Sequence, residues 1–152
     1  MKQMIGRQRA AAYAIALDSD GKILLTQFEK AGHPRSGAWA LPGGGMEWGE
    51  QAHETLQREF KEETGLDATV GALLGVQSEW FEVAPLETDK ISHALRLIFE
   101  VDFIPGALKR NFEDDDTTSD AQWFTMEEVK GLDTVGVVDF GISLLRSKQT
   151  TD

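Results

Sequence analysis

Six glutamates are concentrated in one short stretch of the chain, GGGMEWGEQAHETLQREFKEETGL, which spans residues 43–66. They are Glu47, Glu50, Glu54, Glu59, Glu62 and Glu63. Only one arginine and one lysine lie among them, Arg58 and Lys61. Like charges three or four residues apart destabilise a helix by about 0.2–0.5 kcal/mol per pair unless they are neutralised. Clustered oxygen ligands suit hard divalent cations, so the stretch indicates either a metal site or a solvated acidic helix face.

The spacing predicts a helix over residues 50–64, which contain neither glycine nor proline. Its buried face would consist of the residues that recur every four positions, Ala52, Leu56 and Phe60. Successive helical residues are turned by about 100°, so three carboxylates would share a different face: Glu59, Glu62 and Glu63. Gly65 is placed to end the helix. The helix is thus expected to anchor one side in the core and to present carboxylates on another.

The segments that precede this helix are expected to form a hairpin and a loop. Residues 10–27 predict two strands joined at Ser19-Asp20-Gly21, because a small polar residue and a glycine suit a tight turn. Residues 29–45 are rich in glycine and proline, and we expect them to be a loop that leads to the helix.

The segments that follow the helix predict more sheet and two further helices. Residues 68–83 and 93–103 indicate strands, and in the second the residues expected on one side are Leu95, Leu97, Phe99 and Val101. Residues 111–120 suggest an acidic loop and residues 121–124 a short strand. Thr125 and Glu128 form a capping box that opens a short helix, and a last helix is expected from Val137 to Arg146. This order predicts an α/β fold with helices covering a mixed sheet.

Composition limits the kind of protein and partner. A chain of 152 residues with 41% apolar side chains has the size of one globular domain. Its formal charge of −11 argues against a nucleic-acid polymer as partner, because polyanions are held by clustered lysine and arginine. The absence of cysteine excludes disulfides and thiolate metal sites. No apolar run is long enough to span a membrane, so we expect a cytoplasmic protein with no membrane partner.

The spacing of the acidic stretch resembles a known family. It contains Gly44, five residues, Glu50, seven residues, Arg58-Glu59-Phe60, one residue, Glu62-Glu63, one residue and Gly65-Leu66. This pattern matches the 23-residue signature of the Nudix hydrolases at every fixed position, and the preceding Leu41-Pro42-Gly43-Gly44 is similar to that family as well. The resemblance implies one α/β/α sandwich domain over residues 1–152.

The same resemblance implies an activity. Nudix hydrolases cleave a diphosphate linkage in a nucleoside diphosphate derivative or a nucleoside triphosphate. The alternative is a Nudix-fold module that binds or senses a nucleotide without cleaving it. The partner implied is a small nucleotide, and a homodimer is left open. The segment after the signature lacks the run typical of NADH pyrophosphatases and the proline typical of ADP-ribose pyrophosphatases, so the substrate is not predicted beyond its class.

Residue roles carry over from the family by position. The resemblance makes Glu59, Glu62 and Glu63 catalytic metal ligands, with the backbone carbonyl of Gly44 as a further ligand. Arg58 would hold a catalytic glutamate in place. The cation implied is Mg²⁺, for which Mn²⁺ could substitute. Bound metal ions can polarise phosphoryl oxygens and activate water, which would explain the concentration of carboxylates.

Residues outside this carboxylate set provide additional candidates. An extra metal ligand or general base could come from Glu50, Glu113 or Asp120. Glu50 could equally interact with the amino end of the helix, and the acidic loop Glu113–Asp116 could equally be a solvated loop. Trp80 and Phe81 could hold a nucleobase by stacking. In the alternative, one ring packs in the core and the other covers a strand edge.

Overall fold

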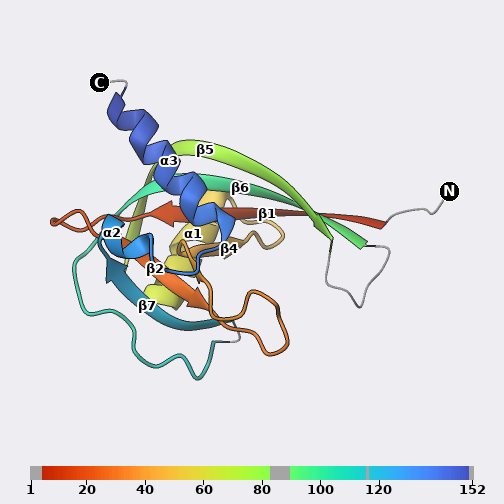
Figure 1. The fold of residues 1–152 in the computed structure, drawn as a ribbon, viewed down its shortest axis with the longest axis horizontal. Coiled ribbons are helices and arrows are strands. Elements are labelled where there is room, and N and C mark those ends of the chain that lie inside the picture. The colour runs from red at the N-terminus through yellow and green to blue at the C-terminus, as the bar shows by residue number, and fades with distance from the viewer. Residues whose placement is uncertain (1–4, 83–89, 116, 151–152) are drawn as a thin grey trace.

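The computed structural model describes residues 5–82, 90–115 and 117–150. One sheet has the strand order β4 (Gly43–Gly45), β1 (Ile5–Ile15), β6 (Lys90–Phe103) and β5 (Ala68–Glu82). The second has the order β3 (Trp39–Ala40), β2 (Ile23–Phe28) and β7 (Thr118–Phe124). The helices are α1 (Ala52–Thr64), α2 (Met126–Val129) and α3 (Gly136–Thr150). Strands β1 and β6 are parallel and the other pairs antiparallel, so the first sheet is mixed (Figure 1).

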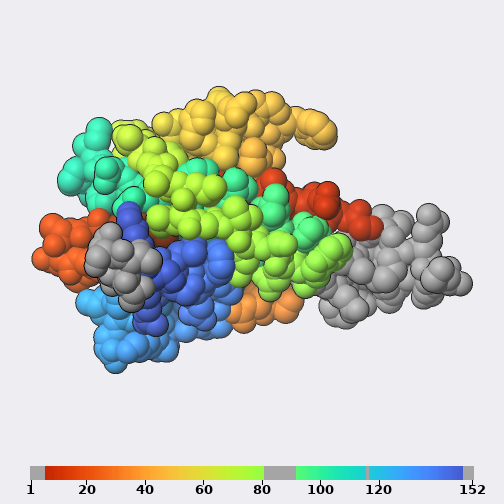
Figure 2. All heavy atoms as spheres, turned by 90° about the horizontal axis from the view of Figure 1, so that it is seen from above, coloured from red at the N-terminus to blue at the C-terminus, as the bar shows by residue number. Residues whose placement is uncertain are grey.

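The helices cover opposite faces of the sheets. Successive side chains of a strand point to opposite faces, so Ala14 of β1 packs with Leu56 and Phe60 of α1, while Ile15 packs with residues of α3. In β2, Leu24 packs in the cluster that contains Leu56 and Phe60, while Ile23 and Leu25 pack in the cluster that contains Ile15. In Figure 2, β5 (green) lies between α1 (yellow) and α3 (blue). The arrangement confirms the predicted α/β/α sandwich.

Helix α1 follows the predicted pattern closely. A capping box between Gln51 and Glu54 opens it, and Gly65 ends it in the left-handed conformation with φ 79°. The Gly65 N–H donates to the carbonyl of Lys61 at 2.9 Å, as expected of a glycine helix cap. Leu56 and Phe60 are fully buried. The core therefore fixes the rotation of the helix and, with it, the direction in which each carboxylate points.

The predicted hairpin between the first two long strands is confirmed at its turn and is wrong along the strands. An antiparallel bridge joins Leu17 to Ile23 on either side of the turn, but β1 and β2 belong to different sheets. Both edges of β1 are already paired, one with β4 and the other with β6, so β2 has no free edge of β1 to join. The turn residues were recognised correctly, but the pairing was decided by strands distant in sequence.

Two further expectations need correction. Residues 29–45 are not entirely loop, because they contain the short strands β3 and β4. In β6 the predicted buried side does not hold throughout, since Leu95 is 41% exposed while Ile98 on the opposite face is fully buried. Both faces of this sheet are covered by other elements, so the strand has no single buried side.

The carboxy-terminal elements agree with prediction. The Thr125 hydroxyl accepts a hydrogen bond from the Glu128 N–H at 3.1 Å and opens α2. Helix α3 extends the predicted last helix at both ends. None of the helices in the described ranges is long and apolar enough to cross a membrane.

Candidate active site

The glycine strand β4 brings the sheet edge against α1. A Cβ atom on Gly44 would lie 2.8 Å from Cδ of Glu59, so only glycine permits this approach. The Gly43 N–H donates to Oε2 of Glu63 at 3.2 Å, and Gly43 has a φ of 146°. These contacts place two of the expected ligands, Glu59 and Glu63, beside one backbone edge.

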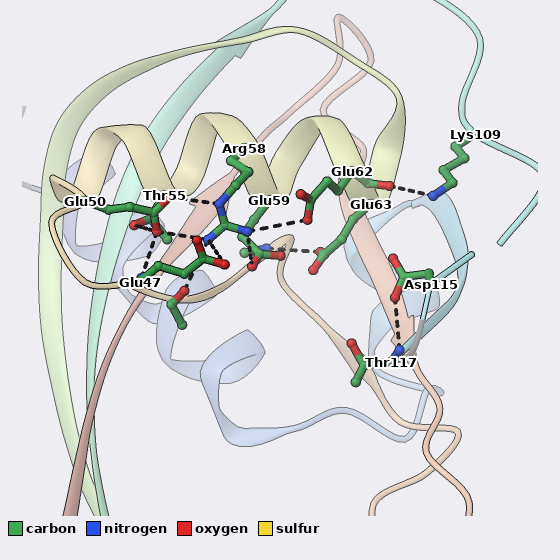
Figure 3. A network of polar contacts seen from close by, with 12 residues as sticks. Glu47, Glu50, Thr55, Arg58, Glu59, Glu62, Glu63, Lys109, Asp115 and Thr117 are labelled. Atoms are coloured by element: carbon green, nitrogen blue, oxygen red, sulfur yellow. Dashed lines mark hydrogen bonds and ion pairs between the residues drawn. The ribbon is translucent and has the colours of Figure 1, made fainter. Parts of the chain in front are cut away.

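Arg58 connects the carboxylates along the helix (Figure 3). Its Nε and Nη2 donate to the two carboxylate oxygens of Glu50 at 2.8 and 3.0 Å. Its Nη1 donates to Glu59 at 2.9 Å and to Glu62 at 3.5 Å. A bidentate guanidinium contact fixes orientation as well as charge, so Arg58 is placed to orient Glu50 and Glu59.

The partners of Glu50 satisfy its negative charge. The hydrogen bond from Arg58 is the largest cause that lowers the pKa of Glu50 to about 2, and the Glu47 N–H adds to it. Oε1 of Glu50 also accepts from the Thr55 hydroxyl at 2.9 Å. The same ion pair raises the pKa of Arg58. Glu50 thus acts as the counterion of Arg58, and neither expected role, metal ligand or amino-terminal dipole partner, is needed to explain its position.

Glu63 has the opposite environment. It is only 7% exposed, and burial raises its pKa well above the usual range, with the charge of Glu59 as the next cause. Burial also raises the pKa of Glu59, against the influence of Arg58. The expectation that the helix presents all three carboxylates away from its buried side is therefore wrong for Glu63. The rotation fixed by Phe60 turns Glu63 toward β4, whereas the Glu62 side chain remains 56% exposed.

The donor set fits a hard divalent cation. Burial raises the pKa of both Glu59 and Glu63, and the charge of Glu59 raises that of Glu63 further, so a bound cation would offset the cost of keeping both carboxylates charged. Within the described residues, no three acidic or histidine side chains already converge on one point. Arg58 accounts for this, because it draws Glu59 and Glu62 toward its guanidinium. Binding would therefore require small carboxylate rotations.

The ladder between β1 and β4 bears on the expected backbone ligand, Gly44. On one side of the Ala12–Gly44 pair, the Ala14 N–H donates to the Pro42 carbonyl at 2.8 Å. On the other side, the Met46 N–H donates to the Ala10 carbonyl at 2.9 Å. Hydrogen-bonded pairs alternate along an antiparallel ladder, so Gly44 directs its N–H and carbonyl toward Ala12. Gly43 faces the other way, since its N–H donates to Glu63. The backbone group next to the carboxylates is that of Gly43, one residue before the expected ligand.

The acidic loop contributes a residue that was not singled out. Asp115 lies close enough for its charge to raise the pKa of Glu63, and Figure 3 places it on the Glu63 side of the network. Its Oδ1 accepts from the N–H groups of Thr117 and Thr118 at 3.0 and 2.8 Å. An aspartate two residues before a pair of threonines is a local turn signal that could have identified it in the sequence. Asp116 lies outside the described residues.

The two acids preferred from sequence are placed less favourably. Both oxygens of Asp120 have partners in its own strand, the Ala121 N–H at 2.8 Å and the Gln122 amide at 2.6 Å. Glu113 is exposed and is not among the groups that affect the pKa of Glu59 or Glu63. Of the described loop acids, Asp115 is the one that the structure brings to the carboxylate pair.

An open cavity of about 380 Å³ borders this loop. It is lined by Glu29, Arg110, Phe112, Glu113, Asp115, Thr118 and Ser119. Arg110 supplies a positive charge and Phe112 an aromatic ring, over which Lys109 Nζ lies 5.0 Å from the centroid. Asp115 belongs both to the lining of this cavity and to the surroundings of Glu63, so it is the residue that links the two.

The aromatic pair after the helix is not brought to the carboxylates. Trp80 is 65% exposed and stacks on His93, with centroids 4.1 Å apart and an interplanar angle of 4°. Leu97 of β6 lies level with Gly44, because both pair with Ala12. His93 is four residues before Leu97, so the Trp80–His93 stack lies about 13 Å along the sheet from Gly44. Phe81 pairs with Ser92 in the ladder between β5 and β6, and its side chain lies outside the described part of the structure.

Comparisons with known proteins agree with this geometry. An ADP-ribose pyrophosphatase of Methanocaldococcus jannaschii is 37% identical over 116 residues, which cover 76% of this chain and 62% of that protein. The NAD-capped RNA hydrolase NudC of Vibrio atlanticus is 31% identical over 126 residues, which cover 82% of this chain and 40% of that protein. The chain thus spans less than two thirds of the length of either relative.

The fold and the family model point the same way. The crystal structure of a MutT protein from Methanosarcina mazei Go1 shares the fold with a TM-score of 0.75 at 22% identity, over 96% of this chain and 99% of that one. The model of the NUDIX domain matches residues 7–139. That match covers the glycine strand, the carboxylate helix and the acidic loop, and by it the chain belongs to the Nudix hydrolase family.

Proposed function

We propose that this protein is a metal-dependent hydrolase that cleaves a diphosphate linkage in a small nucleotide derivative. The observation that carries the proposal is the neighbouring carboxylate pair Glu59 and Glu63 beside the edge of β4, where burial is the main cause that raises both pKa values. Arg58 pairs with Glu59, whereas none of the described residues forms an ion pair with Glu63, so the site keeps negative charge that suits a divalent cation. We propose Mg²⁺, with Mn²⁺ able to substitute.

Each side chain has a part in this proposal. Glu59, Glu63 and the more exposed Glu62 would hold the cation, and Arg58 would orient Glu59 while Glu50 holds Arg58. Polarisation of a phosphoryl oxygen and activation of a water molecule are the chemistry that a divalent cation supplies when bound. The Gly43 N–H keeps the Glu63 carboxylate in place at the sheet edge.

Asp115 is the candidate general base. Its Oδ1 is held by two backbone N–H groups, which leaves Oδ2 to take a proton from an attacking water. The hydrogen bonds fix the carboxylate without neutralising it, and its position near Glu63 puts it beside the place proposed for the cation. Glu113 and Asp120 remain alternatives for this role that substitution can separate.

Two relatives support a class of substrate. One is named for ADP-ribose and the other for NAD-capped RNA. Both of these substrates contain an adenosine diphosphate unit joined to a further group. We propose the same class here, a diphosphate between a nucleoside and a second group, acted on in the cytoplasm. With a net charge of −11, the protein suits a small substrate better than a long polyanion.

A panel of substrates tests the proposal. Purified protein is incubated with nucleotide sugars, dinucleotides and nucleoside triphosphates in Mg²⁺, and phosphate is measured directly and after phosphatase treatment. At least one compound should be cleaved, and excess chelator should abolish the cleavage. Binding of a nucleotide without turnover of any compound would instead identify a sensing module. Undiminished activity in metal-free buffer would rule out the mechanism.

A further inference from the structure

The face of the four-stranded sheet opposite α1 carries positive charge close to the acidic centre. Arg9 of β1 and Arg96 of β6 lie on this face, as the strand register places them on the same side as Tyr13. In Figure 1 these strands continue past α3 toward the amino terminus. The chain has 26 acidic and only 15 basic residues, so two arginines near the Glu59–Glu63 pair indicate a function for their positive charge.

The glycines of β4 allow Arg9 to approach the strand on one face, as they allow Glu59 to approach it on the other. A Cβ atom on Gly45 would lie 2.6 Å from Nη2 and 2.7 Å from Nε of Arg9, so the guanidinium lies directly on the glycine backbone. On the other face, Glu59 lies on Gly44. Gly43, which binds Glu63, is two residues or about 7 Å from Gly45 along the strand.

The two arginines differ in whether their charge is already used. Arg96 donates to Glu79 at 2.5 Å and to Gln77 at 3.0 Å. The Arg9 side chain is exposed, and it makes no hydrogen bond or ion pair with any of the described residues. Tyr13 joins the two regions, since its pKa, raised mainly by burial, is lowered by the charges of Arg9 and Arg96 and raised by that of Glu63.

We propose that Arg9 binds the diphosphate of the substrate from the sheet face opposite α1, with Arg96 beside it. The inference rests on the substrate class proposed above. A guanidinium offers a planar set of donors that matches phosphoryl oxygens. The substrate would then lie across β4. Glu59 and Glu63 would hold the cation on one face of the strand, and Arg9 would bind the phosphoryl oxygens on the other. The three glycines of β4 permit both approaches, because neither face of the strand carries a side chain.

Binding of ADP in the presence of Mg²⁺ tests this proposal by calorimetry. Arg9→Gln should weaken ADP binding by at least about tenfold, and Arg9→Lys should recover part of the loss because it restores the charge without the planar donors. Arg7→Gln is the matched control, because Arg7 is exposed on the same face of β1 two residues farther out. At 0.15 M ionic strength charges are screened over about 8 Å, so Arg7→Gln should change the affinity less than about twofold.

A second variant reaches Arg9 without replacing it. Gly45→Ala should displace the flexible end of Arg9 and weaken ADP binding, with Mn²⁺ affinity and melting temperature unchanged. Three results would overturn the proposal: Arg9→Gln binding within twofold of wild type, equal losses in Arg7→Gln and Arg9→Gln, or no ADP binding by the wild type. Arg9-dependent ADP binding together with a silent substrate panel would instead reject only the hydrolase function.

Discussion

Helix α1 and the turn before it contain two glutamates in opposite environments. Glu50 lies against Arg58, which lowers its pKa to about 2. Glu63 is buried beside Glu59 and near Asp115, and its pKa is raised well above the usual range. Glu50 has its counterion in Arg58, whereas none of the described residues forms an ion pair with Glu63. The difference indicates that the Glu50 end of this segment is held by a structural ion pair, whereas the Glu63 end is placed to bind a cation.

The largest effect is expected at the uncompensated end. Glu63→Gln keeps the shape of the side chain and removes a charged ligand, so turnover of the best substrate should fall by at least about a hundredfold. The metal-free variant should melt no lower than wild type, because the amide removes a buried charge. Steady-state rates and thermal unfolding measure the two effects.

The matched control for this variant is Glu47→Gln, since the Glu47 side chain is 71% exposed and its distance to Arg58 is 4.0 Å. Its rate should stay within about twofold of wild type, as expected of a weak surface ion pair. Equal rates in wild type and Glu63→Gln would show that Glu63 is not a ligand.

The next effect concerns the acid beside Glu63. Asp115→Asn retains the oxygen that accepts from Thr117 and Thr118 but cannot take a proton, so turnover should fall by about a hundredfold with the fold intact. Glu113→Gln and Asp120→Asn should stay within a few-fold of wild type. If one of these two shows the large loss instead, the general base is that residue and not Asp115.

A smaller effect is expected at the compensated end. Glu50→Gln weakens the hold on Arg58 and so loosens Glu59, which predicts about a tenfold loss of turnover, in the range found when supporting residues are replaced. Because folding lowers the pKa of Glu50 from 4.5 to about 2, the ion pair stabilises the fold above pH 4.5. This contribution is lost as the pH falls toward 2. The melting-temperature difference between wild type and Glu50→Gln should therefore shrink over that interval, and a constant difference would contradict this assignment.

The smallest effect is expected far from the helix. Trp80→Ala removes an exposed ring that stacks on His93 and not on the carboxylate site. Turnover and KM should both remain within about twofold of wild type. A rise in KM of tenfold or more would restore the nucleobase-stacking role that the sequence had suggested.

The same contrast separates what the sequence could predict from what it could not. The position of α1, its buried face and its glycine cap followed from local spacing, which depends only on neighbouring residues. The burial of Glu63 did not, because it depends on β4 lying against the helix after pairing with β1. The mistaken hairpin has the same origin, since β6 comes from far along the chain.

The most direct test of the account is metal binding at the Glu63 end. Mn²⁺ is titrated by calorimetry into metal-free wild type, Glu63→Gln and Glu47→Gln at neutral pH and constant ionic strength. The account predicts that wild type and Glu47→Gln bind with similar affinity and that Glu63→Gln binds at least about tenfold more weakly, as expected when a site loses a charged ligand. Equal Mn²⁺ affinity in all three proteins would contradict the claim that the buried carboxylate pair is a cation site.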